Sequence, residues 1–492
     1  MRINMITLLL VIPLIGSFCL LPFRENSPLN ISRMKQIALA TSLLNLLISI
    51  LLWIEFDYNT TDYQFVYEFK ELSFCHLNVG VDSSSLFFVL LTTFITPICL
   101  LSNWTDITEK LKYFLISFLI LETLQIAAFV VLDLLLFYIF FESVLIPLFI
   151  IILTWGASSS RIRAAFLLFL YTLFGSLFML LAIMTIYHYL GSTDFQLISL
   201  TEISLESQKW LWLAFFLAFA IKTPIWPLNT WLIKAHVEAP LAGSILLAGT
   251  ILKLSTYGIL RVLLNFLPDA TNYFSPFVQT LAIISLIYAS LATIRQSDTK
   301  AVIAYSSVAH MAVITLGLFS NSLIGLEGAV LLGLGHGFVS PALFICVGGV
   351  IYVRYHTRVI FYLKGLATHL PVFTTLFLIF TLANAGIPLS LNFLGEQLSL
   401  IGLWDRSPIS AALGATGILF SACYSLFLYN RISYGSLSPN LKPVKDLDRR
   451  EFILLFSLLV PTLLLGIFPN VVLEALHLPL STLLYIVPSS TF

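Results

Sequence analysis

Four ionisable side chains lie well inside long apolar stretches of this sequence: Glu142, Lys222, Lys253 and Glu396. An ionisable group at bilayer depth costs about 2.5–3.5 kcal/mol on insertion scales. A residue that only filled space would be replaced by leucine without that cost. We therefore take these four residues as candidates for carrying protons across a membrane.

Other titratable side chains share this environment. Glu122 lies in the middle of FLILETLQIAAF, and His236, His310 and His336 lie in or beside apolar runs. His310 and His336 stand among small residues, in SSVAHMA and GLGHGF, where water can enter. We take these four as candidate proton-relay residues. The alternative for each is a buried pair that only fixes packing.

A lysine and a carboxylate in a dry site have the properties that proton transfer needs. Burial disfavours the charged form of a lysine, and a carboxylate within a few ångströms favours that form again. A change in their separation, or the entry of water, therefore moves the lysine between its two protonation states. Series of Lys, His and Glu side chains joined by water are typical of proton relays.

Two of the apolar stretches that carry these residues are interrupted. Pro224 and Pro227 follow Lys222 directly, and Pro388 precedes Glu396 in TLANAGIPLSLNFLGE. Proline removes a backbone donor, so we expect broken helices at both places. Broken helices at membrane depth are tolerated where they line a wet cavity. Two unrelated proline kinks are the alternative.

The elements that hold these residues must be membrane helices. The chain is 59% hydrophobic and only 10% charged, whereas soluble domains are about 45–50% apolar and about 25% charged. We expect an all-α polytopic membrane protein with about 14 transmembrane helices of roughly 20 residues. The expected spans lie near 4–23, 34–54, 84–102, 113–131, 133–154, 164–190, 209–229, 240–265, 276–294, 300–319, 323–352, 371–401, 409–430 and 452–475.

The two breaks fall in the seventh and twelfth expected spans, five spans apart. An odd offset reverses the direction of a helix through the membrane, so a five-helix repeat would be inverted. We therefore expect two inverted five-helix repeats, helices 4–8 and 9–13, with broken helices 7 and 12. A single transmembrane domain, 1–492, would then comprise N-terminal helices 1–3 (1–112), a first repeat (113–265), a second repeat (276–433) and a C-terminal helix and tail (451–492).

Lysine and arginine are divided unevenly between the two sides of this arrangement. Alternate assignment of the connections places 18 of the 25 basic residues on one side and five on the other. Lys222 and Lys253 lie inside helices. The positive-inside rule then places the basic connections inside and both termini outside.

Several other function classes lack support. No Walker A motif is present, and the glycines of GLGHG at 333–337 have the wrong spacing for a dinucleotide site and are typical of close helix packing. The five cysteines form no CxxC pair, so no metal or cluster site is expected. Equal numbers of basic and acidic residues, 25 each, argue against a nucleic-acid partner. We expect no cofactor or metal bound by this chain.

Five segments resemble the antiporter-like family, which includes proton-translocating subunits of respiratory complex I and subunits of multisubunit sodium/proton antiporters. The segments are 132–150, 222–261, 297–318, 334–354 and 382–396, and AHVEAPLAGSILLAGTILKL within the second is highly specific. The resemblance implies that Glu142 tunes a central lysine, Lys222. It implies that Lys253 is a connecting lysine and Glu396 an acid at the exit half. The resemblance places His236, His310 and His336 along the hydrophilic axis between them.

Within the family, the resemblance is closest to mitochondrial members. It implies a core membrane-arm subunit of complex I, the proton-translocating NADH:ubiquinone reductase, in the mitochondrial inner membrane. Basic loops would face the matrix, and both termini the intermembrane space. NADH, FMN, iron–sulfur clusters and ubiquinone would belong to the parent complex. Neighbouring antiporter-like subunits, accessory subunits and phospholipids such as cardiolipin would be the partners.

One position departs from the family pattern. Many relatives have a histidine where this chain has Asn229, and an amide does not titrate in this range. A relay through that position must use water or another group. Two other functions stay open at this point: a subunit of a sodium or potassium/proton antiporter without a redox partner, and a purely structural membrane-arm subunit.

Overall fold

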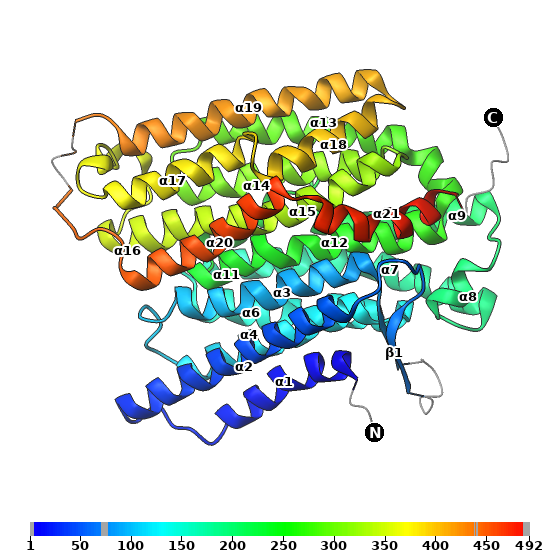
Figure 1. The fold of residues 1–492 in the computed structure, drawn as a ribbon, viewed down its shortest axis with the longest axis horizontal. Helices are drawn as coiled ribbons and strands as arrows, with labels where there is room; N and C mark the ends of the chain where they lie inside the picture. The colour runs from blue at the N-terminus through cyan, green and yellow to red at the C-terminus, as the bar shows by residue number, and fades with distance from the viewer. Residues whose placement is uncertain (1–3, 70–76, 437, 439–440, 486–492) are drawn as a thin grey trace.

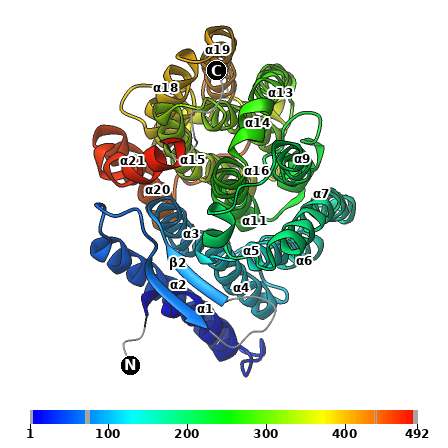
Figure 2. The same cartoon turned by 90° about the vertical axis from the view of Figure 1, so that its right-hand side faces the viewer.

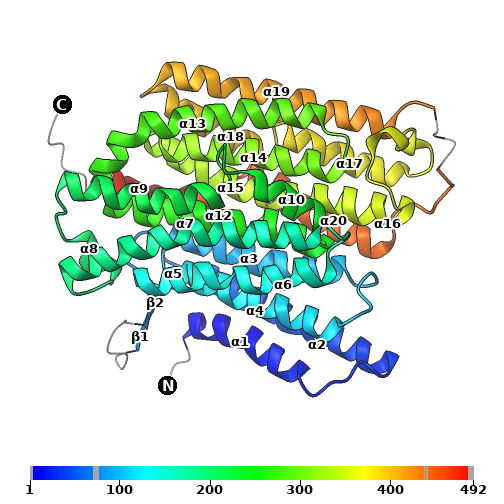
Figure 3. The same cartoon turned by 180° about the vertical axis from the view of Figure 1, so that it is seen from behind.

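The computed structural model describes residues 4–69, 77–436, 438 and 441–485. Long helices run side by side along one axis and make up most of the molecule (Figures 1 and 3). In lipid, every backbone donor and acceptor must pair within the protein, and helices achieve this locally. Within the described residues, eleven helices are long and apolar enough to cross a membrane. The prediction of a helical, multi-pass membrane protein is confirmed.

The first four helices run from one edge of the bundle toward its interior (Figure 2). They are α1 (Met5–Leu20), α2 (Pro28–Glu55), α3 (Ser83–Ser102) and α4 (Leu111–Val130). α1 packs against α2 and α4, and α2 packs against α3. Asp82 begins α3 with a capping box, because its carboxylate accepts a hydrogen bond from the backbone N–H of Ser85.

The prediction that every element is helical misses one feature. The connection 55–82, expected to be a loop, contains the antiparallel strands β1 (Gln64–Phe69) and β2 (Leu77–Val81). Residues 70–76 between them lie outside the described part of the chain. An isolated two-stranded hairpin is only marginally stable in water. Here the buried Val79 and Val81 and a hydrogen bond from the Leu132 N–H to the Asn78 carbonyl (2.9 Å) tie β2 to the end of α4.

The middle of the chain contains the interrupted helices. Its elements are α5 (Leu134–Ser143), α6 (Leu145–Trp155), α7 (Arg161–Leu190), α8 (Phe195–Ser199), α9 (Leu205–Lys222), α10 (Thr230–Glu238), α11 (Leu241–Leu246), η1 (Leu247–Ile251), α12 (Leu252–Gly258) and η2 (Ile259–Leu264). Pro147 separates α5 from α6, because its ring excludes the carbonyl of Ser143 one turn earlier. The elements η1 and η2 are π-helical turns on either side of α12. Such turns occur frequently at functional sites.

The last part of the chain packs around one central helix. Its elements are α13 (Pro268–Arg295), α14 (Thr299–Leu318), α15 (Leu323–Phe344), η3 (Ile345–Ile351), α16 (Tyr352–Tyr355), η4 (Ile360–Tyr362), η5 (Leu366–Thr368), α17 (Pro371–Asn384), α18 (Leu391–Trp404), α19 (Pro408–Ser433), α20 (Arg449–Ile467) and α21 (Asn470–Tyr485). α15 contacts α3, α14, α17, α18, α20 and α21. Figure 2 shows it in the interior of the bundle.

The bounds of the last expected span, 452–475, are wrong. α20 ends at Ile467, and α21 begins at Asn470. Pro469 lies between them and has no N–H with which to continue the helix. At the end of α20, a methyl group on Gly466 would lie 2.2 Å from the carbonyl oxygen of Leu389. The end of α20 therefore packs directly on the connection between α17 and α18.

The two ends of the bundle differ. The connections after α6, α10, α13, α16 and α19 lie together at one end, on the left of Figure 1, which we call the basic end. The opposite end carries β1, β2 and α8, and we call it the hairpin end. Two of the five basic residues expected on this second side, Arg2 and Lys70, lie outside the described residues.

Candidate functional site

Lys222 and Glu142 lie near each other in the first half of the chain, but within the described residues they do not form an ion pair. Lys222 is the last residue of α9, and its side chain is buried. Its Nζ donates a hydrogen bond to the Phe141 carbonyl (2.7 Å) and lies 3.4 Å from the centroid of the Phe141 ring. Glu142, the next residue, interacts electrostatically with Lys222. Among the described residues its buried Oε1 atom has no hydrogen-bond partner, whereas the carboxylate also interacts with the Ser176 hydroxyl.

The break between α9 and α10 sets the position of Lys222. Pro224 and Pro227 lie in this connection, 223–229. Because the helix stops, carbonyls at the end of α9 lose their usual partners. The indole Nε1 of Trp231 donates to the Ile221 carbonyl (2.8 Å) and satisfies one of them. The lysine is thus held at a helix end inside the bundle rather than at its surface.

A second lysine contacts a histidine on the central helix. Lys253 lies in α12, fully buried, and its Nζ lies 2.8 Å from Nδ1 of His336 on α15. The same Nζ donates to the Ala248 carbonyl (2.5 Å). A methyl group at Gly335 would lie 2.4 Å from Oδ1 of Asn392, and one at Gly337 2.7 Å from Leu91. These glycines let α15 approach α18 and α3 closely around His336.

The polar series continues from His336 toward α18. The rings of His336 and His310 lie with centroids 5.8 Å apart. His310 Nδ1 is 3.0 Å from Oε1 of Glu396, and its Nε2 is 3.1 Å from Oδ1 of Asn384. Lys253, His336, His310 and Glu396 therefore form a series of neighbouring titratable groups across the interior of the bundle.

The break between α17 and α18 gives Glu396 its surroundings. Pro388 lies in this connection, 385–390. Gly386 has φ +71°, and a methyl group there would lie 2.6 Å from Oε2 of Glu396. Asn384 ends α17 and donates from Nδ2 to the Ser425 hydroxyl (3.1 Å). Sequence reasoning missed Asn384, although an amide next to a broken membrane helix was a signal for it.

Three sequence-predicted positions lie outside this series. Glu122 on α4 accepts a hydrogen bond from Asn45 of α2 (2.8 Å), and its other oxygen has no partner. His236 on α10 stacks on Phe344, with centroids 4.7 Å apart and planes 8° apart, and both of its ring nitrogens are unpartnered. Asn229 is buried, and its Nδ2 has no hydrogen-bond partner.

Lys300 and Arg261 are two basic residues at the ends of the expected spans 300–319 and 240–265. Both lie inside elements, Lys300 in α14 and Arg261 in η2. Lys300 is 5% exposed. Its side chain reaches inward to the Ala239 carbonyl (2.9 Å). Asp298, two residues earlier, caps the helix and places Lys300 within its first turn.

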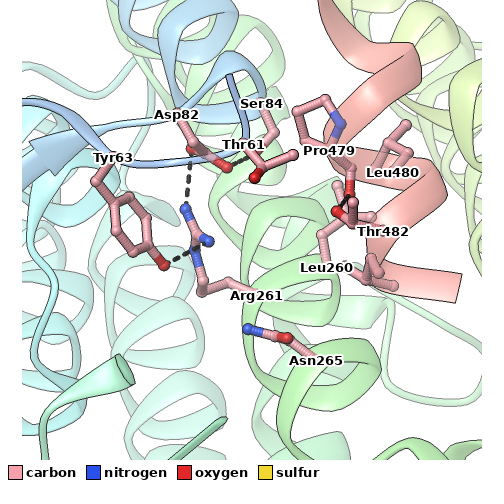
Figure 4. Close-up of a pocket in the computed structure, with 11 residues that line it drawn as sticks. Thr61, Tyr63, Asp82, Ser84, Leu260, Arg261, Asn265, Pro479, Leu480 and Thr482 are labelled. Carbon is pink, nitrogen blue, oxygen red and sulfur yellow. Dashed lines mark hydrogen bonds and ion pairs between the residues drawn. The ribbon is translucent and has the colours of Figure 1, made fainter. Parts of the chain in front are cut away.

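A polar cavity of about 160 Å³ opens at the hairpin end, between η2, the residues before α3, and α21 (Figure 4). Arg261 crosses it, with Nη2 2.9 Å from Oδ1 of Asp82 and Nη1 2.9 Å from the Tyr63 hydroxyl. Burial by itself raises the pKa of Asp82, but the Arg261 guanidinium and hydrogen bonds from Ser84 and Ser85 outweigh it, so the pKa lies below its usual value. Burial raises the pKa of Tyr63.

Comparisons with known proteins agree with this arrangement. A family described as "NADH:quinone oxidoreductase/Mrp antiporter, TM" matches residues 131–432. NADH-ubiquinone oxidoreductase chain 4 of Mycosarcoma maydis is 61% identical over 481 residues, which cover 98% of this chain and 99% of that protein.

Two solved structures share the fold. A chain of respiratory complex I from Thermus thermophilus with bound NADH superposes with a TM-score of 0.89 at 27% identity, covering 98% of this chain and all of that one. A chain of the Mrp complex from Dietzia sp. DQ12-45-1b superposes with a TM-score of 0.87 at 19% identity, covering 99% of this chain and 98% of that one. The family match, the full-length relative and the buried lysine–histidine–glutamate series lead to one conclusion. This chain belongs to the NADH-ubiquinone oxidoreductase chain 4 family of antiporter-like membrane subunits.

Proposed function

We propose that this chain is a membrane-arm subunit of respiratory complex I that carries protons across the membrane, driven by electron transfer in other subunits. The observation that carries the proposal is the buried series Lys253–His336–His310–Glu396, in which each group lies beside the next. Each member can hold and release a proton. Such groups are costly in hydrocarbon, and in membrane helices they mark ion and proton pathways.

Glu142 and Lys222 form the second part of the proposed path. Lys222 has a carbonyl and a ring face as its near partners, and the Glu142 carboxylate lies nearby, beyond ion-pair distance in the described structure. Movement of that carboxylate toward the ammonium stabilises the protonated lysine, and movement away favours proton release. This pair then passes protons to or from Lys253. Glu122 serves as a lateral relay group on α4 in this proposal.

The proposed topology has fourteen spans. The eleven long helices, the 16-residue α1 and the two broken pairs α9–α10 and α17–α18 make fourteen. We place the first inverted repeat at 113–265 and the second at 276–433. Lys222 ends the first half of one broken pair, and Glu396 lies in the second half of the other. The support for two repeats of opposite orientation is that each contains one broken pair, five spans apart.

We also propose a membrane and an orientation for the subunit. The basic end faces the matrix of the mitochondrion, and the hairpin end faces the intermembrane space, by the positive-inside rule. Other membrane-arm subunits and phospholipids such as cardiolipin surround the chain. NADH, FMN, iron–sulfur clusters and ubiquinone belong to other parts of the complex. The full-length relative at 61% identity supports complex I over an antiporter, because the Mrp chain shares only 19% identity and hence only the fold.

The test is NADH- and quinone-dependent proton uptake by sealed membrane vesicles that contain the assembled complex. Lys222→Ala is compared with wild type and with Lys364→Ala, an exposed lysine at the basic end. We expect Lys222→Ala to lower uptake at least about tenfold, since positioned proton transfer contributes about 10²–10⁴ in rate. Lys364→Ala should leave uptake unchanged. Normal uptake by an assembled Lys222→Ala complex would disprove the proposal.

A further inference from the structure

We propose that Lys300 is a further proton-carrying residue, which takes protons from the basic end and passes them through His236 to Lys253. This inference rests on the proposed function, and it supplies the entry route that the series Lys253–His336–His310–Glu396 lacks. In each step an ammonium or imidazolium N–H bond breaks and an N–H bond forms on the next group. The Lys300 amine then regains a proton from water at the basic end.

The side chain of Lys300 extends into the protein, unlike that of an ordinary lysine at the end of a membrane helix. Such lysines usually extend their ammonium groups to the aqueous surface. Here the side chain is 5% exposed, and its Nζ contacts the Ala239 carbonyl (2.9 Å) and the Ser244 hydroxyl (3.4 Å). An ammonium has three donors. Within the described residues, no carboxylate lies within ion-pair distance of it.

Partly exposed charged groups lie beside the start of α14 at the basic end. Asp298 caps α14 and forms a partly exposed ion pair with Arg358 (3.5 Å), immediately before Lys300. A cavity of about 220 Å³ at the same end is lined by residues of α7 and α10, including Glu238. Glu238 interacts electrostatically with Lys300. Lys300 is therefore a buried titratable group close to the aqueous side.

His236 is placed to receive a proton from Lys300. It interacts electrostatically with both Lys300 and Lys253. The Ser244 hydroxyl, which Lys300 contacts, also donates to the His236 carbonyl (3.1 Å). Both ring nitrogens of His236 are buried and have no hydrogen-bond partner among the described residues, whereas nearly all buried polar groups have a partner. The ring packs on Phe344, which leaves both nitrogens available to accept a proton.

A purely structural role for Lys300 predicts different behaviour. Ala239 is the C-cap residue of α10, and lysine side chains satisfy free carbonyls at helix ends. To satisfy the Ala239 carbonyl, the side chain at position 300 needs only a hydrogen-bond donor. A proton carrier must also lose its proton, which arginine does not do in proteins.

The experiment uses the assembled complex in sealed vesicles and measures proton uptake per NADH oxidised. The Lys300 variants are Lys300→Arg, which keeps a donor and a fixed charge, and Lys300→Gln, which keeps a donor without a charge. His236→Phe removes both nitrogens and keeps a stacking ring. Lys364→Gln is the exposed control, and Lys222→Gln reports on the proposed function.

We expect both Lys300 variants and His236→Phe to lower proton uptake at least about tenfold, with assembly retained and Lys364→Gln unchanged. Normal uptake by either Lys300 variant would overturn the inference. If the Lys300 variants do not assemble, normal uptake by His236→Phe overturns it, and loss of uptake supports it. If Lys222→Gln alone loses uptake, the proposed function stands and only this inference fails. If Lys222→Gln also pumps normally, the proposed function fails.

Discussion

Replacing His336 by glutamine tests whether the central series conducts protons or only holds helices together. His336 Nδ1 lies 2.8 Å from Nζ of Lys253, and the His310 ring follows at 5.8 Å between centroids. Glutamine offers Lys253 an acceptor at a similar reach, but it does not titrate. His336→Gln therefore keeps the contact and interrupts the relay.

These contacts indicate how much each variant should change the rate of proton transfer and the stability of the subunit. Loss of one positioned proton-transfer group costs about 10²–10⁴ in rate, which corresponds to about 3–5 kcal/mol at about 1.4 kcal/mol per tenfold. Stability should change by less than about 1 kcal/mol, because one acceptor replaces another. His336→Phe differs, since it leaves the buried Lys253 ammonium without this acceptor and should destabilise the subunit by about 1.5–3 kcal/mol.

The assay is proton uptake per NADH oxidised in sealed vesicles, together with the amount of assembled complex. We expect His336→Gln to assemble normally and to transport protons at least about 100-fold more slowly. His336→Phe should lower both assembly and transport. Proton uptake within about twofold of wild type by assembled His336→Gln would refute the reasoning, because the series would then have no need for a titratable group at this position.

Two further predictions concern packing and the hairpin end. Gly395→Ala places a methyl group 2.5 Å from the Leu332 backbone nitrogen and should lower the yield of assembled complex. Gly333→Ala is the control, because its methyl group would meet nothing nearer than 3.9 Å, and it should leave the yield unchanged. Equal yields of the two variants would contradict the close packing of α15 and α18. Asp82→Asn leaves the buried Arg261 guanidinium unpaired and should lower the free energy of unfolding by about 3–5 kcal/mol, measured as thermal inactivation of the assembled complex. Because the pKa of Asp82 is depressed in the folded state, its contribution is complete above its unfolded pKa of about 3.9 and is lost as the pH falls through the lower folded value. The difference between wild type and Asp82→Asn should therefore be constant from pH 8 to about 5 and shrink only below about 4; a difference that shrinks near neutral pH would refute this sign.

The sequence by itself determined the class of the molecule and the members of the central series. A chain with 59% hydrophobic and 10% charged residues must form membrane helices, because lipid leaves no other partner for the backbone. Charged residues in lipid are costly wherever they stand, so Lys253 and Glu396 were identifiable without any knowledge of their neighbours. The family follows from sequence as well, since its motifs lie at matching spacings along most of the chain.

The tertiary structure decided which of these residues meet. No spacing along the chain indicates that Lys253 contacts His336, 83 residues away, or that Glu122 pairs with Asn45 of α2 instead of a lysine. These contacts depend on how α15 packs between α3, α14 and α18.

The direction of a side chain at a helix end was also beyond sequence reasoning. A lysine at the first turn of a membrane helix can extend to water or fold inward, and its identity alone does not distinguish the two. Lys300 turns inward because the Ala239 carbonyl at the end of α10 lies within reach, and because Gly348, where a methyl group would lie 3.1 Å from Cε of Lys300, leaves room for its side chain. Both neighbours come from other helices, so only their packing places the lysine inside the protein.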